Sequence, residues 1–216
     1  GSLKLWDLYW TADRTADEES LPTVTDKRQE WNMPPYNYAG VTSSSLGLTI
    51  PASTEKAPYI YAGQTTFDNP ITAQAIRNCG KWRREVEYEQ VMDSKRLYTG
   101  INYPLLRYSD VLLMYVEATL EYEGLMEWDI LLRVRDRAGI STDRAKYNDL
   151  QKFRQLLRNE RAREFCFEAT RKYDLIRWGV FVEEMSDYDV EQKHVVLPIP
   201  SIELGVNGLL KQNPLW

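Results

Sequence analysis

The stretch "NERAREFCFEATRKYDLIRWG", residues 159–179, sets acids, arginines and aromatic rings side by side in a pattern that predicts one uninterrupted helix. At about 100° per residue, Glu160, Glu164 and Arg171 fall on the same face as Phe153 and Leu157. A second apolar stripe on the opposite side comprises Ala162, Phe165, Cys166, Ala169, Tyr173 and Ile176. We therefore expect neighbouring structure to cover this helix on both sides.

Carboxylates on a covered helix face need partners, because an isolated buried carboxylate is costly. Arginines occur both on the preceding segment and on the helix itself: Arg107, Arg133, Arg135, Arg137, Arg161, Arg163 and Arg171. The sequence therefore predicts a structural network of ion pairs around Glu160 and Glu164.

The same two glutamates also fit a catalytic interpretation, since paired carboxylates occur in glycosidases and in dimetal sites. A dimetal site needs a Glu-x-x-His partner, and the only histidine, His194, lies in an unrelated segment that is expected to be extended. Glycosidase carboxylates face each other across a substrate, whereas residues four apart on a helix point the same way. Arginines would also lower both carboxylate pKa values and keep both groups ionised, which removes the general acid. We predict no catalytic residue, no metal site and no cofactor.

Two helices are expected upstream of this stretch. Residues 103–124 place Pro104 before an apolar run and Gly124 after it, which indicates a buried helix. Residues 128–139 again end at a glycine, so the two segments should form an antiparallel hairpin. Asn148 and Gln151 have capping-box spacing and are expected to open the next helix.

The first hundred residues have a different composition. They hold most of the prolines and several loop clusters, among them residues 32–40 and 41–47. Residues 3–10 and 57–63 are rich in aromatic and branched side chains and are interpreted as short strands. We expect a loop-rich part with short strands over residues 1–100 and a helical scaffold over residues 101–216.

Composition excludes several classes of function. The chain of 216 residues carries a formal charge of −5 and has no basic run that would follow a phosphate backbone, so nucleic acid is not an expected partner. The longest apolar run, residues 111–116, is far too short to span a bilayer. Cys79 and Cys166 sit in dissimilar surroundings and lack metal-ligand spacing, and we do not expect them to pair.

Five blocks of sequence resemble the C-terminal end of SusD/RagB-type proteins, in the same order. They are "YPLLRYSDVLLMYVEA" (103–118), "RVRDRAG" (133–139), "NERAREFCFEATRKYDLIRWG" (159–179), "LPIPSIEL" (197–204) and "LLKQNP" (209–214). The resemblance covers roughly residues 100–216, and the first hundred residues match only in general character. The family usually continues from Gln-Asn-Pro with a glycine and an aromatic residue, where this chain has Leu215 and Trp216.

The resemblance implies a mainly α-helical, SusD-like fold in which tetratricopeptide-like helix pairs support a loop-rich, sparsely β-structured region. It implies a cell-surface protein of the outer membrane that binds glycans without cutting them and caps a SusC-like TonB-dependent transporter. Because family members are usually more than twice this length, residues 1–216 would be a C-terminal portion, and the lipid anchor would lie outside this chain. A protein-interaction scaffold that holds the transporter without binding sugar is the alternative, and a glycoside hydrolase is the less favoured one.

The expected ligand is an oligosaccharide, whose flat C–H faces bind to exposed aromatic rings flanked by hydrogen-bonding groups. The loop-rich part supplies such residues, and the candidates are Trp31, Asn32, Tyr36, Tyr38, Tyr59 and Tyr61. Tyr59 and Tyr61 lie two apart on an expected strand and would point to the same side. The alternative for each ring is that it packs the loops onto the helices.

Overall fold

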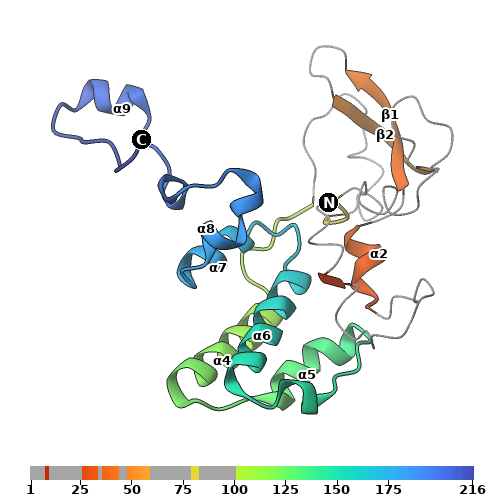
Figure 1. The fold of residues 1–216 in the computed structure, drawn as a ribbon. Helices are drawn as coiled ribbons and strands as arrows, with labels where there is room; N and C mark the ends of the chain where they lie inside the picture. Colours follow the sequence, from red (N-terminus) through yellow and green to blue (C-terminus); the bar gives the residue numbers. More distant parts are fainter. Residues whose placement is uncertain (1–7, 10–25, 34–35, 44–47, 59–78, 83–100) are drawn as a thin grey trace. The chain divides into compact units, whose positions relative to one another are not determined.

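The computed structural model describes residues 8–9, 26–33, 36–43, 48–58, 79–82 and 101–216 (Figure 1). Residues 30, 36–43 and 48–58 are described by their backbone alone. The chain divides into two units, Gly1–Phe167 and Glu168–Trp216. The expected fold class, mainly helical with a sparse β-structured part, is confirmed.

The predicted helical hairpin is formed by α4 (Tyr108–Glu123) and α5 (Trp128–Arg137) (Figure 1). Gly124 ends α4 with a φ of +68°, and its N–H donates to the carbonyl of Leu120 at 3.2 Å. Gly139 has a φ of +82° just beyond α5. Both glycines therefore supply the left-handed residue that ends a helix. Helix α4 begins later than Pro104 suggested, because Arg107 is still extended (φ −121°, ψ 157°).

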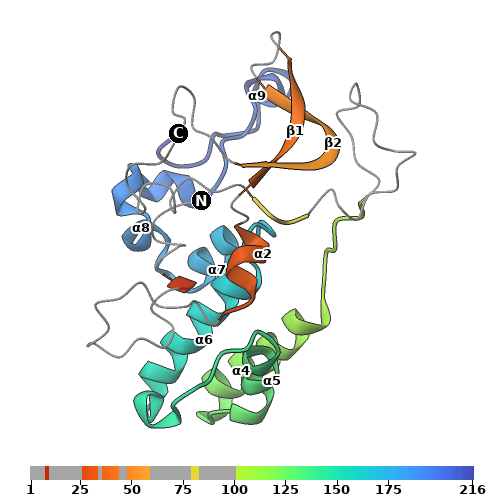
Figure 2. The same ribbon diagram turned by 90° about the vertical axis from the view of Figure 1, so that its right-hand side faces the viewer.

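Helix α6 (Leu150–Glu164) lies beside α4 and follows a short 3-10 helix, η4 (Arg144–Tyr147) (Figures 1 and 2). Its N-cap is Asp149, whose carboxylate accepts from the N–H of Lys152 at 2.8 Å. The predicted capping box at Asn148 and Gln151 is therefore wrong by one position. The backbone of Asp149 is extended, as an N-cap requires, whereas the backbone of Asn148 is not.

The core of the first unit fills the space between these three helices. Its buried members are Leu113, Val116, Leu120, Leu131, Val134, Phe153, Leu156, Leu157 and Phe165. Trp128 meets Phe153 edge to face, with ring centroids 4.7 Å apart. Only one side of α4 takes part, since Tyr108 and Tyr115 on its other side are 65% and 54% exposed. The expectation of a buried helix is thus confirmed for one side of α4 and wrong for the other.

The predicted uninterrupted helix over residues 159–179 is also wrong. Helix α6 ends at Glu164, and Phe167 and Ala169 have φ values of +63° and +57°, which a right-handed helix cannot accommodate. As a result the expected second apolar stripe does not form, since Ala169 and Tyr173 are exposed.

The β structure of the described residues is an antiparallel pair, β1 (Tyr36–Ser43) and β2 (Leu48–Pro58). The register runs from Tyr36 opposite Pro58 to Ser43 opposite Leu48, with an irregularity between Tyr38 and Gly40. Residues 36–43, expected to be loop, thus form a strand. Gly40, one of the residues that suggested a loop, lies at the irregularity opposite Pro51, and Pro58 is the last residue of β2.

The strands predicted over residues 57–63 and 3–10 lie largely outside the described residues. Of residues 57–63, Ala57 and Pro58 end β2 and residues 59–63 lie outside the described residues. Of residues 3–10, Leu8 and Tyr9 are helical rather than extended, and the others lie outside the described residues.

The second unit contains short helices: α7 (Arg171–Arg177), α8 (Phe181–Glu184), η5 (Ser186–Tyr188), η6 (Gln192–Val195) and α9 (Ser201–Val206). Hydrogen bonds from the side chain of Gln212 connect two parts of its last segment. The amide of Gln212 accepts from the N–H of Ile199 at 2.8 Å and donates to the carbonyl of the same residue at 2.9 Å.

Candidate functional site

Two buried glutamates on α6 lie at the centre of an ion-pair cluster. The guanidinium groups that donate to Glu160 belong to Arg28 at 2.7 Å, Arg135 at 2.8 Å and Arg163 at 2.8 Å. Those that donate to Glu164 belong to Arg28 at 2.9 Å, Arg107 at 3.1 Å and Arg137 at 2.6 Å. Arg28, from the short helix α2 (Arg28–Asn32), bridges both glutamates and also pairs with Asp26 at 2.8 Å. The predicted structural network is confirmed.

The membership of the cluster differs from the prediction in part. Arg107, Arg135, Arg137 and Arg163 are the predicted partners that the structure brings together. Arg133, Arg161 and Arg171 contact other groups, namely Tyr108, Asp110 and Trp178. Arg28 was missed because it lies 132 residues from Glu160 in the sequence, and helix periodicity carries no information about a contact of that range.

The electrostatics of the cluster keep both glutamates ionised. Burial alone would raise the pKa of Glu160, but the charges of Arg163, Arg28 and Arg135 outweigh it and hold that pKa well below its usual range. For Glu164, burial is likewise outweighed by the hydrogen bond from Arg137 and the charge of Arg28, and the pKa is lowered. A carboxylate that stays ionised cannot act as a general acid near neutral pH.

The end of α6 shows why the helix can stop inside the protein. The last carbonyls of a helix lack intrahelical donors. The carbonyl of Arg163 accepts from the hydroxyl of Tyr9 at 2.7 Å, and that of Glu164 accepts from Lys81 Nζ at 2.6 Å. Side chains from distant segments thus satisfy groups that a continued helix would have satisfied.

The predicted ligand residues occupy different environments. Trp31 on α2 is 47% exposed. Asn32 is buried, and its amide donates to the hydroxyl of Tyr9 and to the carbonyl of Arg163, which supports a structural role. Tyr36 and Tyr38 lie on β1, opposite Pro58 and Lys56. Tyr59 and Tyr61 lie outside the described residues.

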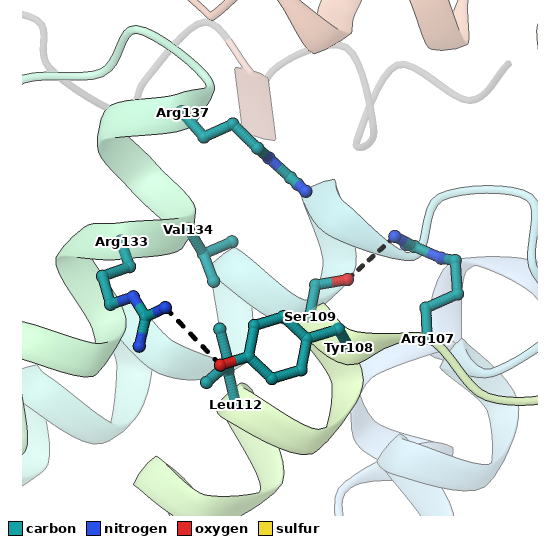
Figure 3. A pocket seen from close by; sticks show the side chains of 7 residues that line it. All are labelled: Arg107, Tyr108, Ser109, Leu112, Arg133, Val134 and Arg137. Atoms are coloured by element: carbon teal, nitrogen blue, oxygen red, sulfur yellow. Dashed lines mark hydrogen bonds between the residues drawn. The ribbon is translucent and has the colours of Figure 1, made fainter.

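A pocket of about 250 Å³ lies between the N-terminal end of α4 and α5 (Figure 3). Its lining residues are Arg107, Tyr108, Ser109, Leu112, Arg133, Val134 and Arg137. Arg107 and Arg137 point toward each other from opposite sides, and the guanidinium of Arg133 reaches the hydroxyl of Tyr108 at 3.5 Å (Figure 3). Sequence reasoning identified the three arginines only as partners for glutamate.

The other candidate residues of the sequence are His194 and the two cysteines. The Nδ1 atom of His194, on η6 rather than in an extended segment, accepts from the N–H of Glu191 at 2.8 Å. Cys79 and Cys166 are not joined by a disulfide. Within the described part of the chain, no three His, Cys, Asp or Glu side chains are grouped to hold a metal ion. The helices described here include none with the length and apolar character to cross a membrane.

Comparisons with known proteins agree with this fold. The family model described as the SusD family matches residues 2–196, which extends the resemblance over the first hundred residues. A SusD-like protein of Formosa agariphila is 32% identical over 144 residues, which cover 61% of this chain and 26% of that protein. The crystal structure of a SusD homologue from Bacteroides thetaiotaomicron aligns with a TM-score of 0.64 at 22% identity, over 99% of this chain and 43% of that one. A SusD superfamily protein from Bacteroides vulgatus aligns with a TM-score of 0.60 at 20% identity, over 100% of this chain and 44% of that one.

Proposed function

Because the chain belongs to the SusD family, we propose that it is part of a non-catalytic, glycan-binding protein that serves a SusC/SusD-type uptake system. The family match over residues 2–196 is the observation that carries this proposal. The glutamate cluster supports the non-catalytic part of the proposal. Glu160 and Glu164 would be the first candidates for the carboxylates of a glycoside hydrolase, but both form ion pairs with arginines.

The 216 residues cover only part of the length of the proteins to which they are similar. The chain spans 26% of the length of the Formosa relative and 43% of the Bacteroides thetaiotaomicron structure. We propose that residues 1–216 are the C-terminal portion of a longer SusD-like protein that is lipid-anchored at the outer-membrane surface and caps a SusC-like TonB-dependent transporter. A pull-down from outer membranes tests the partner, and recovery of the transporter without any sugar binding would favour the scaffold alternative.

Glycan binding is tested by affinity electrophoresis against a panel of neutral and acidic polysaccharides. The aromatic candidates are Trp31, Tyr36, Tyr38, Tyr59 and Tyr61, and Trp31→Ala and Tyr59→Ala are the first variants. We expect at least one polysaccharide to retard the wild-type chain and the substitutions to weaken that retardation, because each removes a ring on which a sugar can stack. Retardation that is unchanged in both variants would reject those two residues as ligand contacts.

The hydrolase alternative is tested on the same panel. We expect no reducing ends to accumulate on incubation with the wild-type chain. Reducing ends that appear with the wild type would reject the non-catalytic proposal. Their loss in a Glu160→Gln variant that circular dichroism shows to be folded would assign the activity to the buried glutamate.

A further inference from the structure

The pocket between α4 and α5 is lined by three cationic side chains and by no acidic one. Arg107 and Arg137 are held by the same oxygen of Glu164, at 3.1 and 2.6 Å, so the positions of both guanidinium groups are fixed before any ligand arrives. Arg107 also donates to the hydroxyl of Ser109 at 2.8 Å. Prepositioned guanidinium groups lose little side-chain entropy on binding, and they match the geometry of carboxylate and sulfate oxygens.

Arg133 carries a positive charge of the pocket that no carboxylate of the described residues balances. Glu164 pairs with Arg107 and Arg137 and also with Arg28, whose other carboxylate partners are Asp26 and Glu160. Arg133 contacts the ring and hydroxyl of Tyr108, and within the described residues it forms no ion pair with a carboxylate. In a protein whose formal net charge is −5, this excess of positive charge is local. The N-terminal end of α4 adds a partial positive charge at the same place.

The rest of the pocket suits a sugar ring rather than a bare ion. Leu112 and Val134 supply apolar surface, and Tyr108 presents a ring that is 65% exposed. Tyr115 follows two turns later on the same side of α4, about 10 Å along the helix, and is 54% exposed. An oligosaccharide could therefore stack on successive tyrosines while its acidic group meets the arginines.

The opposite end of α4 is unsuited to an anion. Tyr122 is 91% exposed there, and its sequence neighbours are Glu121, which pairs with Arg154, and Glu123, which forms no ion pair within the described residues. Like charges would repel an acidic group at that end. The charge distribution along α4 therefore places the acidic group at the arginine end.

We propose that the pocket formed by Arg107, Arg133, Arg137 and Tyr108 binds an acidic sugar unit, with its carboxylate or sulfate ester on the guanidinium groups and its ring on Tyr108. This rests on the proposed function, whose ligand class it narrows to acidic glycans. The carboxylate and the sulfate ester share the oxyanion chemistry that the arginines recognise.

Nuclear magnetic resonance of the arginine Nε–H groups tests the site in the 216-residue chain. The probes are methyl glucuronide and glucose sulfate, and methyl glucoside is the neutral match that lacks the charge. We expect both acidic probes, or one of them, to shift the signals of Arg107, Arg133 and Arg137, and methyl glucoside to leave them unchanged. A response to methyl glucuronide alone identifies the carboxylate as the preferred group, and a response to glucose sulfate alone identifies the sulfate ester.

The matched variants are Arg133→Gln and Arg144→Gln. Arg133 takes part in no described ion pair, so its replacement leaves the glutamate cluster intact, and equal melting temperatures would verify the fold. Arg144 on η4 is an exposed arginine that pairs with Asp129 and lies outside the pocket lining. We expect Arg133→Gln to weaken binding of the acidic probe about tenfold and Arg144→Gln to leave it unchanged.

Three results would overturn the inference: no shift with either acidic probe, equal shifts with the neutral probe, or equal losses in the two variants. The polysaccharide panel separates this failure from failure of the proposed function. Retention of neutral polysaccharides without any acidic binding would reject the pocket and leave glycan binding standing, whereas retention of no glycan would reject both.

Discussion

Replacing Glu160 by glutamine should destabilise the chain strongly. The substitution keeps the size of the side chain and removes its charge, so Arg28, Arg135 and Arg163 lose the carboxylate that they share. Glu160 and Arg135 are both 0% exposed, and water cannot replace the lost partner. Breaking a buried pair from one side costs about 3–5 kcal/mol. For a chain of this size that loss lowers the melting temperature by about 10 °C.

The matched control is Glu121→Gln. Glu121 also accepts from an arginine, Arg154, but its side chain is 47% exposed, so we expect a loss below about 1 kcal/mol. Urea unfolding followed by circular dichroism measures both variants. The reasoning is refuted if Glu160→Gln falls within 1 kcal/mol of Glu121→Gln, because the buried charges would then not depend on one another.

Three further predictions concern the same scaffold. The free energy of unfolding should fall as the pH drops below the ordinary glutamate pKa of 4.5. Glu160 and Glu164 have lower pKa values in the folded chain, so the unfolded chain binds more protons at low pH. Urea titrations from pH 7 to pH 3 measure this dependence, and a constant free energy of unfolding would contradict the prediction. Asp149→Ala should lower the melting temperature because it removes the N-cap of α6, whereas Asn148→Ala should change the melting temperature little; equal effects would reject the assigned cap. Leu131→Ala should cost about 2–5 kcal/mol in urea unfolding, because its side chain is fully buried in the helical core, and a loss below 1 kcal/mol would contradict that burial.

Local signals in the sequence identified the scaffold correctly. The hairpin of α4 and α5 followed from apolar runs that end at Gly124 and Gly139, and both glycines have the left-handed backbone that such ends require. The need for counter-charges around Glu160 and Glu164 followed from burial alone, and four of the expected arginines are present. These features depend on residues close together in the chain or on the rule that buried charges are paired.

Features that depend on distant segments could not be predicted in the same way. The pattern after Glu164 is compatible with a longer helix, but Tyr9 and Lys81 supply hydrogen bonds to the last carbonyls of α6 and allow the chain to turn there. Similarly, Tyr115 lies in the apolar run over residues 111–116, yet no described neighbour covers it and it is exposed. Periodicity shows which face a residue occupies, and tertiary structure decides whether that face is covered.

The glutamate cluster connects the scaffold with one of the candidate ligand residues. A helix of five residues has no independent stability in water, so α2 must be held by its contacts. Arg28 pairs with both glutamates of α6, and Asn32 donates to the last turn of the same helix. Between these two anchors Trp31 remains exposed. The buried charges therefore do more than stabilise α6, because they also fix the position of the tryptophan that we propose as a sugar-stacking surface.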